Sequence, residues 1–253
     1  MTDIGQWFKN LPIFTRHWLG LTLAFSLLGR FGLLKPEYLY LLSEKFINEL
    51  QIWRPLTAVF YYPLNPATGF HFMINCYFLY NYSLRLETGA FQGRPADYFF
   101  MLLFNWACCV IISLFKEMPL LMDPMVLSVL YVWCQLNREA IVNFWFGTRF
   151  PAMYLPWVLL GVNLVLSGGG FMELSGILVG HLYFFLMYKY PEEYGGAQLL
   201  TTPSALKKYF PETRGGVYSF GGNAPQNIQR PQAPAAPAFG GHRWGPGQPL
   251  GGN

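Results

Sequence analysis

Glu173-Leu174-Ser175-Gly176-Ile177-Leu178-Val179-Gly180 places two glycines four residues apart inside an apolar run. Residues at this spacing share one face of a helix, and a face of small residues lets two helix backbones approach closely within a membrane. Such pairs also arise by chance in apolar segments, so other parts of the chain must support the interpretation. The stretch predicts a membrane helix packed tightly against a neighbour through Gly176 and Gly180.

The composition is that of a membrane protein. Of 253 residues, 53% are hydrophobic and 12% are charged, whereas a soluble domain carries about 25% charged residues. Apolar sequence dominates up to residue 190, and the remainder is rich in Gly, Pro, Gln and Ala. The net charge of +4 comes from scattered basic residues, which argues against a nucleic-acid partner.

Six segments are candidate membrane-spanning helices, which need about 20 mainly apolar residues. They lie at about residues 17–34, 69–84, 98–115, 118–135, 152–167 and 171–188. We expect Asp123-Pro124 to interrupt the fourth, and residues 36–50 to form a helix at the membrane surface. The sequence thus predicts an all-α membrane protein: a six-span helical bundle over residues 1–190 and a cytosolic, largely disordered tail over residues 191–253.

The basic residues indicate how the bundle is oriented. Six spans place both termini on one side, and that side carries twelve Lys and Arg residues against five on the other. Basic residues are enriched on the cytosolic side of membrane proteins. We therefore expect both termini to be cytosolic.

The cysteines and histidines show no ligand pattern. Cys76, Cys108, Cys109 and Cys134 fall in apolar runs without Cys-x-x-Cys spacing, and none pairs with the four histidines. We expect buried thiols and neither a metal nor a cofactor.

A Trp-Arg pair occurs in the first loop, at Gln51-Ile52-Trp53-Arg54-Pro55. An amphipathic ring at headgroup level beside a guanidinium that can hydrogen-bond loop carbonyls resembles the first-loop signature of rhomboid proteins. The alternative is an ordinary interfacial tryptophan with an arginine that reaches the headgroups. Trp53, Arg54, Gly176 and Gly180 are the residues that we assign to the fold motif.

The catalytic residues of rhomboid proteases are missing from the corresponding positions. Those enzymes carry a serine nucleophile in a Gly-x-Ser-Gly stretch, but this chain has Val126-Leu127-Ser128-Val129 there. They place a histidine three residues before the glycine pair, where this chain has Glu173. We predict no catalytic residue, because the Ser128 hydroxyl has no positioned base. Glu173 either reaches the headgroups or lines a hydrated cavity, and for His181 we favour a packing hydrogen bond over a proton relay.

Longer motifs extend the resemblance to about residues 1–220. They are Phe78-Leu79-Tyr80, Arg85-Leu86-Glu87-Thr88-Gly89-Ala90-Phe91, Gly93-Arg94-Pro95-Ala96-Asp97-Tyr98 and Phe144-Trp145-Phe146-Gly147-Thr148-Arg149-Phe150. With these motifs the chain resembles the derlins, rhomboid-like pseudoproteases of the endoplasmic reticulum membrane. The resemblance implies a six-span rhomboid-like bundle and a non-catalytic role in endoplasmic-reticulum-associated degradation, in which misfolded lumenal and membrane proteins are moved to the cytosol. The implied partners are those misfolded proteins, a ubiquitin-ligase complex, membrane lipid and other derlins in a homo- or hetero-oligomer.

The tail carries a further motif, Trp244-Gly245-Pro246-Gly247-Gln248-Pro249-Leu250. It resembles the SHP box of derlin tails, here near residues 239–250, which binds valosin-containing protein, an AAA ATPase. The resemblance implies that Trp244, Gly245, Gly247 and Leu250 contact the ATPase, with the two large side chains as anchors. The alternative is a Gly/Pro-rich tail without a motif.

Three other functions compete with this interpretation. An intramembrane serine protease would need a base near Ser128. A channel or transporter usually shows internal repeats or charges at mid-membrane, and the sequence shows neither. A passive scaffold for ubiquitin-ligase complexes differs from the leading interpretation mainly in one respect: the misfolded substrate, or client, would not touch the spans.

Overall fold

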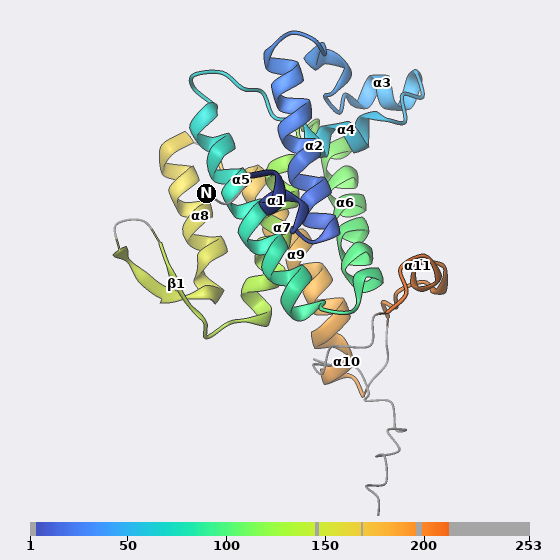
Figure 1. Ribbon diagram of the computed structural model, residues 1–253, viewed down its shortest axis with the longest axis vertical. Coiled ribbons are helices and arrows are strands. Elements are labelled where there is room, and N and C mark those ends of the chain that lie inside the picture. Colours follow the sequence, from blue (N-terminus) through green and yellow to red (C-terminus); the bar gives the residue numbers. More distant parts are fainter. Residues whose placement is uncertain (1–3, 145–146, 168, 196–198, 213–253) are drawn as a thin grey trace, which may run out of the picture. The chain divides into compact units, whose positions relative to one another are not determined.

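The computed structural model describes residues 4–144, 147–167, 169–195 and 199–212, which are mostly helical (Figure 1). The helices are α1 (Ile4–Lys9), α2 (Ile13–Arg30), α3 (Ser43–Asn48), α4 (Arg54–Phe60), α5 (Gly69–Arg85), α6 (Pro95–Lys116), α7 (Met122–Leu136), α8 (Leu155–Ser167), α9 (Phe171–Phe184), α10 (Tyr190–Glu193) and α11 (Ser204–Tyr209). Short 3-10 helices, η1 (Pro36–Tyr38) and η4 (Ala152–Tyr154), and π-helical turns, η2 (Leu86–Ala90) and η5 (Phe185–Lys189), complete the helical segments.

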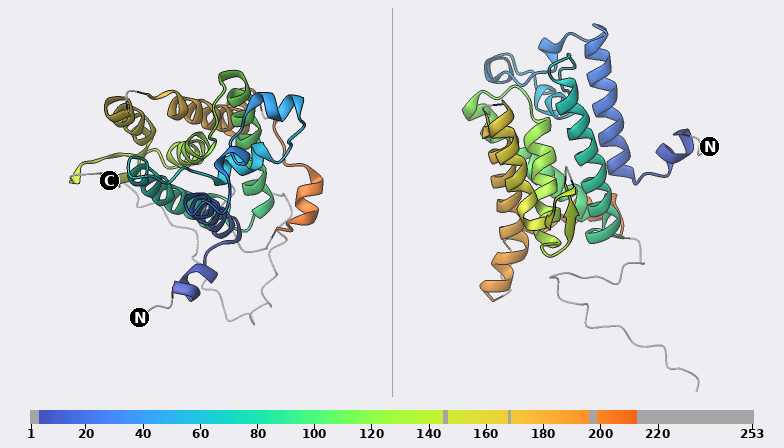
Figure 2. Two further views of the ribbon diagram at one scale, coloured as in Figure 1. Left: turned by 90° about the horizontal axis from the view of Figure 1, so that it is seen from above. Right: turned by 90° about the vertical axis from the view of Figure 1, so that its left-hand side faces the viewer.

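Helix α7 forms the core of the bundle. Every residue from Met122 to Cys134 is buried, as expected for a helix that is apolar on all sides. Figure 2 shows α7 in the middle, with α5, α6, α8 and α9 around it. Its most extensive contact is with α9.

Two glycines of α9 make that contact close. A β-carbon added to Gly176 would lie 2.6 Å from the carbonyl oxygen of Pro124, and one added to Gly180 would lie 2.6 Å from the carbonyl oxygen of Ser128. Both obstacles are backbone atoms, which cannot move aside as a flexible side chain can. The two glycines therefore allow α9 to lie directly against the backbone of α7.

The helix boundaries differ from the predicted spans in several places. Helix α2 covers Ile13–Arg30 instead of residues 17–34. Asp123 and Pro124 do not interrupt a helix, because α7 starts at Met122 and holds both residues in its first turn. Proline is tolerated there, since the first backbone N–H groups of a helix have no helical partner. The last predicted span extends through η5 and α10, so residue 190 falls inside a continuous helical run, Phe171–Glu193.

Two loops also differ from the prediction. The expected surface helix over residues 36–50 is divided into η1 and α3. Between α7 and α8, strands β1 (Ile141–Asn143) and β2 (Arg149–Pro151) pair antiparallel, with Val142 opposite Phe150. The all-α prediction included no strands, so this short hairpin is a departure from it, whereas the rest of the described chain is mostly helical.

Two helices in the described part of the chain are long and apolar enough to cross a membrane by length and composition. They are Pro95–Lys116 and Phe171–Glu193. The apolar helices Met122–Leu136 and Ala152–Val165 are shorter.

Candidate functional site

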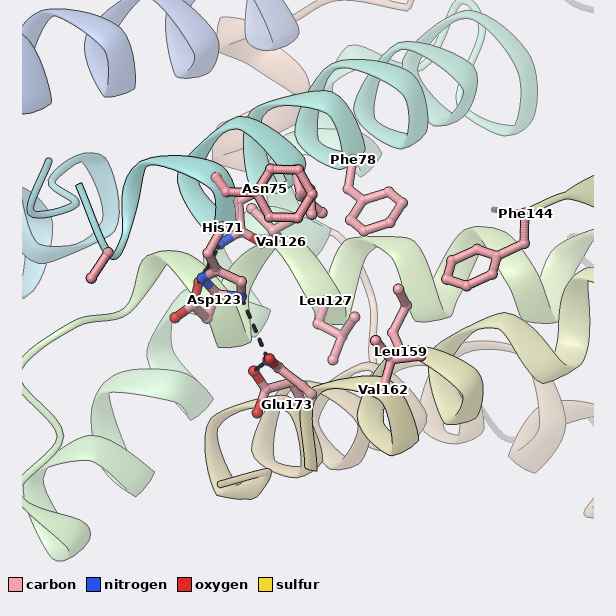
Figure 3. Close-up of a pocket in the computed structure, with 14 residues that line it drawn as sticks. His71, Asn75, Phe78, Asp123, Val126, Leu127, Phe144, Leu159, Val162 and Glu173 are labelled. Atoms are coloured by element: carbon pink, nitrogen blue, oxygen red, sulfur yellow. Dashed lines mark hydrogen bonds and ion pairs between the residues drawn. The ribbon is translucent and has the colours of Figure 1, made fainter. Parts of the chain in front are cut away.

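A cavity of about 210 Å³ lies between α5, α7, α8 and α9 (Figure 3). Polar side chains gather at one end of it and apolar side chains at the other. The polar lining residues are His71, Asn75, Asp123, Asn163 and Glu173. The apolar lining residues are Ala67, Phe70, Ile74, Phe78, Val126, Leu127, Phe144, Leu159 and Val162.

The polar residues meet because of the way the helices alternate in direction. His71, Asp123 and Glu173 lie in the first turns of α5, α7 and α9. Asn163 lies in the last two turns of α8, which runs the opposite way. Each side chain therefore lies at the same end of the bundle, although the residues are as far apart as 102 positions in sequence (His71 to Glu173).

Hydrogen bonds join these side chains across the four helices. The amide of Asn75 donates to Asp123 Oδ1, and the amide of Asn163 donates to Glu173 Oε1. Asn163 Nδ2 also lies 3.5 Å from His71 Nε2, and His71 Nδ1 lies 3.9 Å from Asp123 Oδ1. Asp123 is almost fully buried, with 7% of its surface exposed. A buried carboxylate is tolerated when such partners compensate for the water it has lost.

Tyr62 adds a hydroxyl to the polar end from the loop before α5. Its oxygen lies 2.6 Å from His71 Nδ1, and the two atoms share a hydrogen bond. Burial raises the pKa of the Tyr62 hydroxyl above its ordinary value, and the Asp123 and Glu173 carboxylates raise the pKa further. Tyr62 therefore stays neutral and keeps a proton for hydrogen bonding.

The arrangement suits binding to a partly polar chain segment. The polar end offers two carboxylates, two carboxamides and an imidazole to groups that carry hydrogen-bond donors. The other end offers an apolar wall that includes Phe78, Leu127 and Leu159. In the residues that the structure describes, no set of three or more His, Cys, Asp and Glu side chains is arranged to hold a metal ion.

Ser128, which lies at the position of a rhomboid nucleophile, and His181, the histidine of the same helix as Glu173, have separate partners. The Ser128 hydroxyl is buried and donates to the carbonyl of Met125 in its own helix, at 2.8 Å. His181 Nδ1 shares a hydrogen bond of 2.8 Å with the Tyr131 hydroxyl, a contact between α9 and α7. Glu173 lines the polar end of the cavity, where its carboxylate accepts a hydrogen bond from Asn163.

The Trp-Arg pair lies at the start of α4. The Arg54 side chain is fully buried, and its Nη1 donates to the carbonyls of Glu37 at 2.6 Å and Tyr40 at 2.7 Å. Its Nε donates to Gln51 Oε1 at 2.6 Å. Trp53 has 48% of its surface exposed. Arg54 therefore fastens the first loop onto α4, and neither residue lines the polar cavity.

The other site residues predicted from the sequence fall into two groups. Gly176 and Gly180 lie at the contact between α7 and α9 and do not line the cavity. Trp244, Gly245, Gly247 and Leu250 lie outside the described residues.

From the sequence, Asp123 is expected to interrupt a helix and Glu173 has two possible positions, and no local motif joins the cavity residues into one site. A pattern that identifies them is the position of each polar residue in its apolar segment. His71, Asp123 and Glu173 fall in the first turns of their apolar helices and Asn163 near the end of its helix, so helices of alternating direction bring these residues together.

Comparisons with known proteins place the chain in a family. A model of the Der1-like family matches residues 11–204. Derlin-1 of Homo sapiens is 55% identical over 251 residues, which cover 99% of this chain and 99% of that protein. Derlin-1 of Caenorhabditis elegans is 49% identical over 253 residues, and Derlin-1 of Drosophila melanogaster is 40% identical over 251 residues, each match covering 99% of this chain and all of the relative. The chain therefore belongs to the Der1-like family, the derlins.

Proposed function

We propose that the chain is a non-catalytic component of endoplasmic-reticulum-associated degradation, which helps misfolded lumenal and membrane proteins to reach the cytosol. The observation that carries this proposal is the cavity between α5, α7, α8 and α9, with its polar and apolar ends. An ionisable side chain costs about 2.5–3.5 kcal/mol at the centre of a membrane helix on insertion scales, and one within a membrane segment indicates a functional site. Asp123 and Glu173 lie in the first turns of their helices, and their position in the cavity indicates a path for polar groups.

The proposal includes six spans, formed by α2, α5, α6, α7, α8 and α9, with both termini cytosolic in the endoplasmic reticulum membrane. The excess of basic residues on the side of the termini supports this orientation. Helices α5, α7 and α9 then begin on the lumenal side and α8 ends there. The polar end of the cavity accordingly faces the lumen, from which misfolded clients come.

The cavity would lower the barrier that a polar polypeptide meets in lipid. Unpaired peptide groups of a client would hydrogen-bond the polar end, and its apolar side chains would pack on the other end. Helix α5 has 17 residues and α8 has 13, fewer than the roughly 20 residues that span a bilayer. Short spans thin the surrounding bilayer, which shortens the path that the client must cross.

An intramembrane protease is the less favoured alternative. The Ser128 hydroxyl is bonded to its own helix, and His181 is bonded to Tyr131. Glu173 stands at the place of the histidine base and pairs with Asn163. These partners support a pseudoprotease.

The cytosolic tail would supply the pulling partner. Its Trp244–Leu250 segment has the pattern of the box that binds valosin-containing protein. A ubiquitin-ligase complex and other derlin subunits are the remaining proposed partners, and a passive scaffold for that ligase is the alternative function.

Crosslinking separates the leading proposal from the scaffold. A photoreactive amino acid would replace Phe70 on α5 or Leu159 on α8, both of which line the cavity. The control positions are Leu28 on α2 and Leu164 on α8, which have exposed side chains and do not line it. With a client trapped by inactive valosin-containing protein, we expect client adducts at Phe70 and Leu159 but not at the controls. The absence of client adducts at all four positions would favour the scaffold, and equal labelling at all four would show that the client does not use the cavity.

Protease digestion of sealed microsomes tests the orientation. Tags at both termini should be digested, and the loop of residues 36–66 should be protected. A protected tail would contradict the orientation and the recruitment of a cytosolic ATPase.

A further inference from the structure

A second cavity, a groove of about 490 Å³, lies between α2, α4 and α6, away from the polar cavity. Its lining is almost wholly apolar and includes Trp18, Leu21, Phe60, Leu103, Trp106 and Phe210. Leu21 and Leu103 have exposed side chains. In the six-span arrangement, the groove is a lipid-facing furrow between the first and third spans.

The length of the groove matches one leaflet of the bilayer. Along α2 it runs from Ile13 to Leu21, which is about 12 Å at 1.5 Å per residue. Half of the hydrocarbon core of a bilayer is about 15 Å. Helix α4 crosses the far end, where Trp106 Nε1 donates to the carbonyl of Pro55 at 3.0 Å and Leu56 lines the groove. The groove is thus limited to the leaflet on the side of the chain termini.

A short basic helix lies at the near end of the groove. The Phe210 ring, which follows α11, contacts the rings of Phe14 and Phe99 at centroid distances of 5.3 and 5.4 Å. Lys207 and Lys208 on α11 are exposed, and Lys207 Nζ lies 3.7 Å from a Glu212 carboxylate oxygen. Figure 1 shows α11 beside the lower end of α6. Glu212 offsets part of this charge, and the two lysines together still leave this end of the groove with a net positive charge.

Thr202 holds this segment in place beside α6. Its hydroxyl donates to Asp97 Oδ1 at 2.6 Å, and Asp97 also lies 3.5 Å from the Arg94 guanidinium. The basic helix is therefore fastened to the bundle by a polar bond as well as by the Phe210 ring. The short helix that carries the two lysines is thus held beside α6.

We propose that this groove holds one acyl chain of an anionic phospholipid from the cytosolic leaflet, with the headgroup bound by Lys207 and Lys208. The proposal rests on the orientation given under the proposed function. Basic side chains at the cytosolic surface attract anionic lipids, and basic pockets beside membrane helices bind their headgroups. The apolar lining accepts the chain, and the two lysines select the charge of the headgroup.

The lining and the charged end together favour an acyl chain as the occupant of the groove. An acyl chain makes only apolar contacts, which suits a lining that is almost wholly apolar. The lysines on α11 would meet an anionic headgroup attached to that chain. A helix of a partner or of a second copy is the competing occupant, and it would appear in the crosslinking experiment as adducts to protein.

Photocrosslinking to lipid tests the proposal on the full-length protein. A photoreactive amino acid would replace Leu103 in the groove, or Leu178 on the exposed face of α9 as the control. The protein would be reconstituted in vesicles of equal parts phosphatidylserine and phosphatidylcholine, and the adducts weighed by mass spectrometry. A lysine near an anionic surface contributes about a fivefold preference. We expect phosphatidylserine adducts to exceed phosphatidylcholine adducts by about fivefold to thirtyfold at Leu103, and to equal them at Leu178.

Charge variants identify the source of the selectivity. Lys207→Gln with Lys208→Gln should bring the ratio at Leu103 close to one while phosphatidylcholine adducts persist, which shows that the groove remains intact. Arg149→Gln, an exposed basic residue on β2, should leave the ratio unchanged. Three outcomes would overturn the proposal. The ratio of phosphatidylserine to phosphatidylcholine adducts at Leu103 could be close to one in the unmodified protein, it could be unaffected by the lysine changes, or the adducts could be to protein instead of lipid.

The microsome digestion separates this proposal from the function on which it rests. A protected tail would overturn both the orientation and the cytosolic lipid site. A digested tail with no lipid preference at Leu103 would overturn the lipid site alone.

Discussion

The carboxylate of Glu87 caps the start of α2 through Thr15. Glu87 Oε2 accepts the backbone N–H and the hydroxyl of Thr15, both at 2.8 Å, and Oε1 accepts the N–H of Phe14 at 3.0 Å. The first N–H groups of a helix have no partner within the helix, and their partial positive charge attracts a carboxylate. Glu87 lies in η2, 72 residues further along the chain than Thr15, so one side chain joins the start of α2 to the end of α5.

Glu87→Ala should destabilise the bundle. It leaves the N–H groups of Phe14 and Thr15 without an acceptor, and the loss of a helix cap costs about 0.5–2 kcal/mol. Thermal unfolding in detergent, followed by circular dichroism, measures the change. The control is Glu139→Ala, because Glu139 is exposed and its removal should leave the unfolding temperature unchanged. Equal unfolding temperatures for the two variants would contradict a capping role.

Gly180→Ala should weaken the packing of α9 on α7. The added methyl group would meet the carbonyl oxygen of Ser128 at 2.6 Å, and overpacking of this kind costs about 1–3 kcal/mol. Gly161→Ala on α8 is the matched control, since a β-carbon there meets nothing within 4 Å. The midpoint of thermal unfolding should be lower for Gly180→Ala than for the unmodified chain, and it should be unchanged for Gly161→Ala.

A larger side chain at the same position should also affect function. Gly180→Leu should reduce the turnover of clients, while the tail still binds its ATPase.

Ser128→Ala should leave client degradation unchanged. The hydroxyl is buried and bonded to the carbonyl of Met125, so it is not activated as a nucleophile. The purified protein should not cleave rhomboid substrates, and a serine-reactive fluorophosphonate should not label it. Cleavage of a transmembrane substrate that Ser128→Ala abolishes would establish a protease instead.

Glu173→Leu should reduce client contact in the polar cavity. The change removes a carboxylate that accepts a hydrogen bond from Asn163 and makes the polar end of the cavity more apolar. Crosslinks from Leu159 to a trapped client should fall severalfold. Glu173→Gln is the control, because its amide keeps a polar group and a hydrogen bond with Asn163, and crosslinking should be largely retained. If Glu173→Leu leaves the adducts unchanged, the cavity is not the client path.

The helical bundle was accessible to sequence reasoning because its signals are local. Apolar runs of helix length mark α5 and α6 to within a few residues, since a membrane core demands such runs. The start of α7 was misjudged because Pro124 was taken as a break, whereas proline fits a first helical turn. Strands β1 and β2 have three residues each, which is too short for an alternating pattern to show.

The polar cavity was less accessible because its members are distant in sequence. His71 and Asn163 are 92 residues apart and meet only when α5 and α8 pack beside α7. Glu87 is a similar case, because it follows α5 in the sequence whereas its partner Thr15 lies in α2. Sequence identifies each of these residues as polar in an apolar setting, but the pairing follows from helix packing.

Trp244→Ala with Leu250→Ala should abolish binding of valosin-containing protein. The segment from Asn223 to Asn253 is dominated by Gly, Pro, Gln and Ala, and such a composition cannot bury a core. A segment of this kind loses ordering entropy on binding and needs a few large apolar anchors. Between residues 224 and 253, the large apolar residues are Ile228, Phe239, Trp244 and Leu250.

The double variant removes the two large apolar anchors of the Trp244–Leu250 motif. In a quantitative pull-down from detergent-solubilised membranes, the ATPase should be lost while membrane insertion and client crosslinking at Leu159 persist. Clients should then accumulate on the protein, because they enter the cavity but are not pulled out. Ile228→Ala is the matched control, since it removes an apolar side chain of the same segment outside the box and should leave ATPase binding intact. Full binding by the double variant would mean that another cytosolic segment recruits the ATPase.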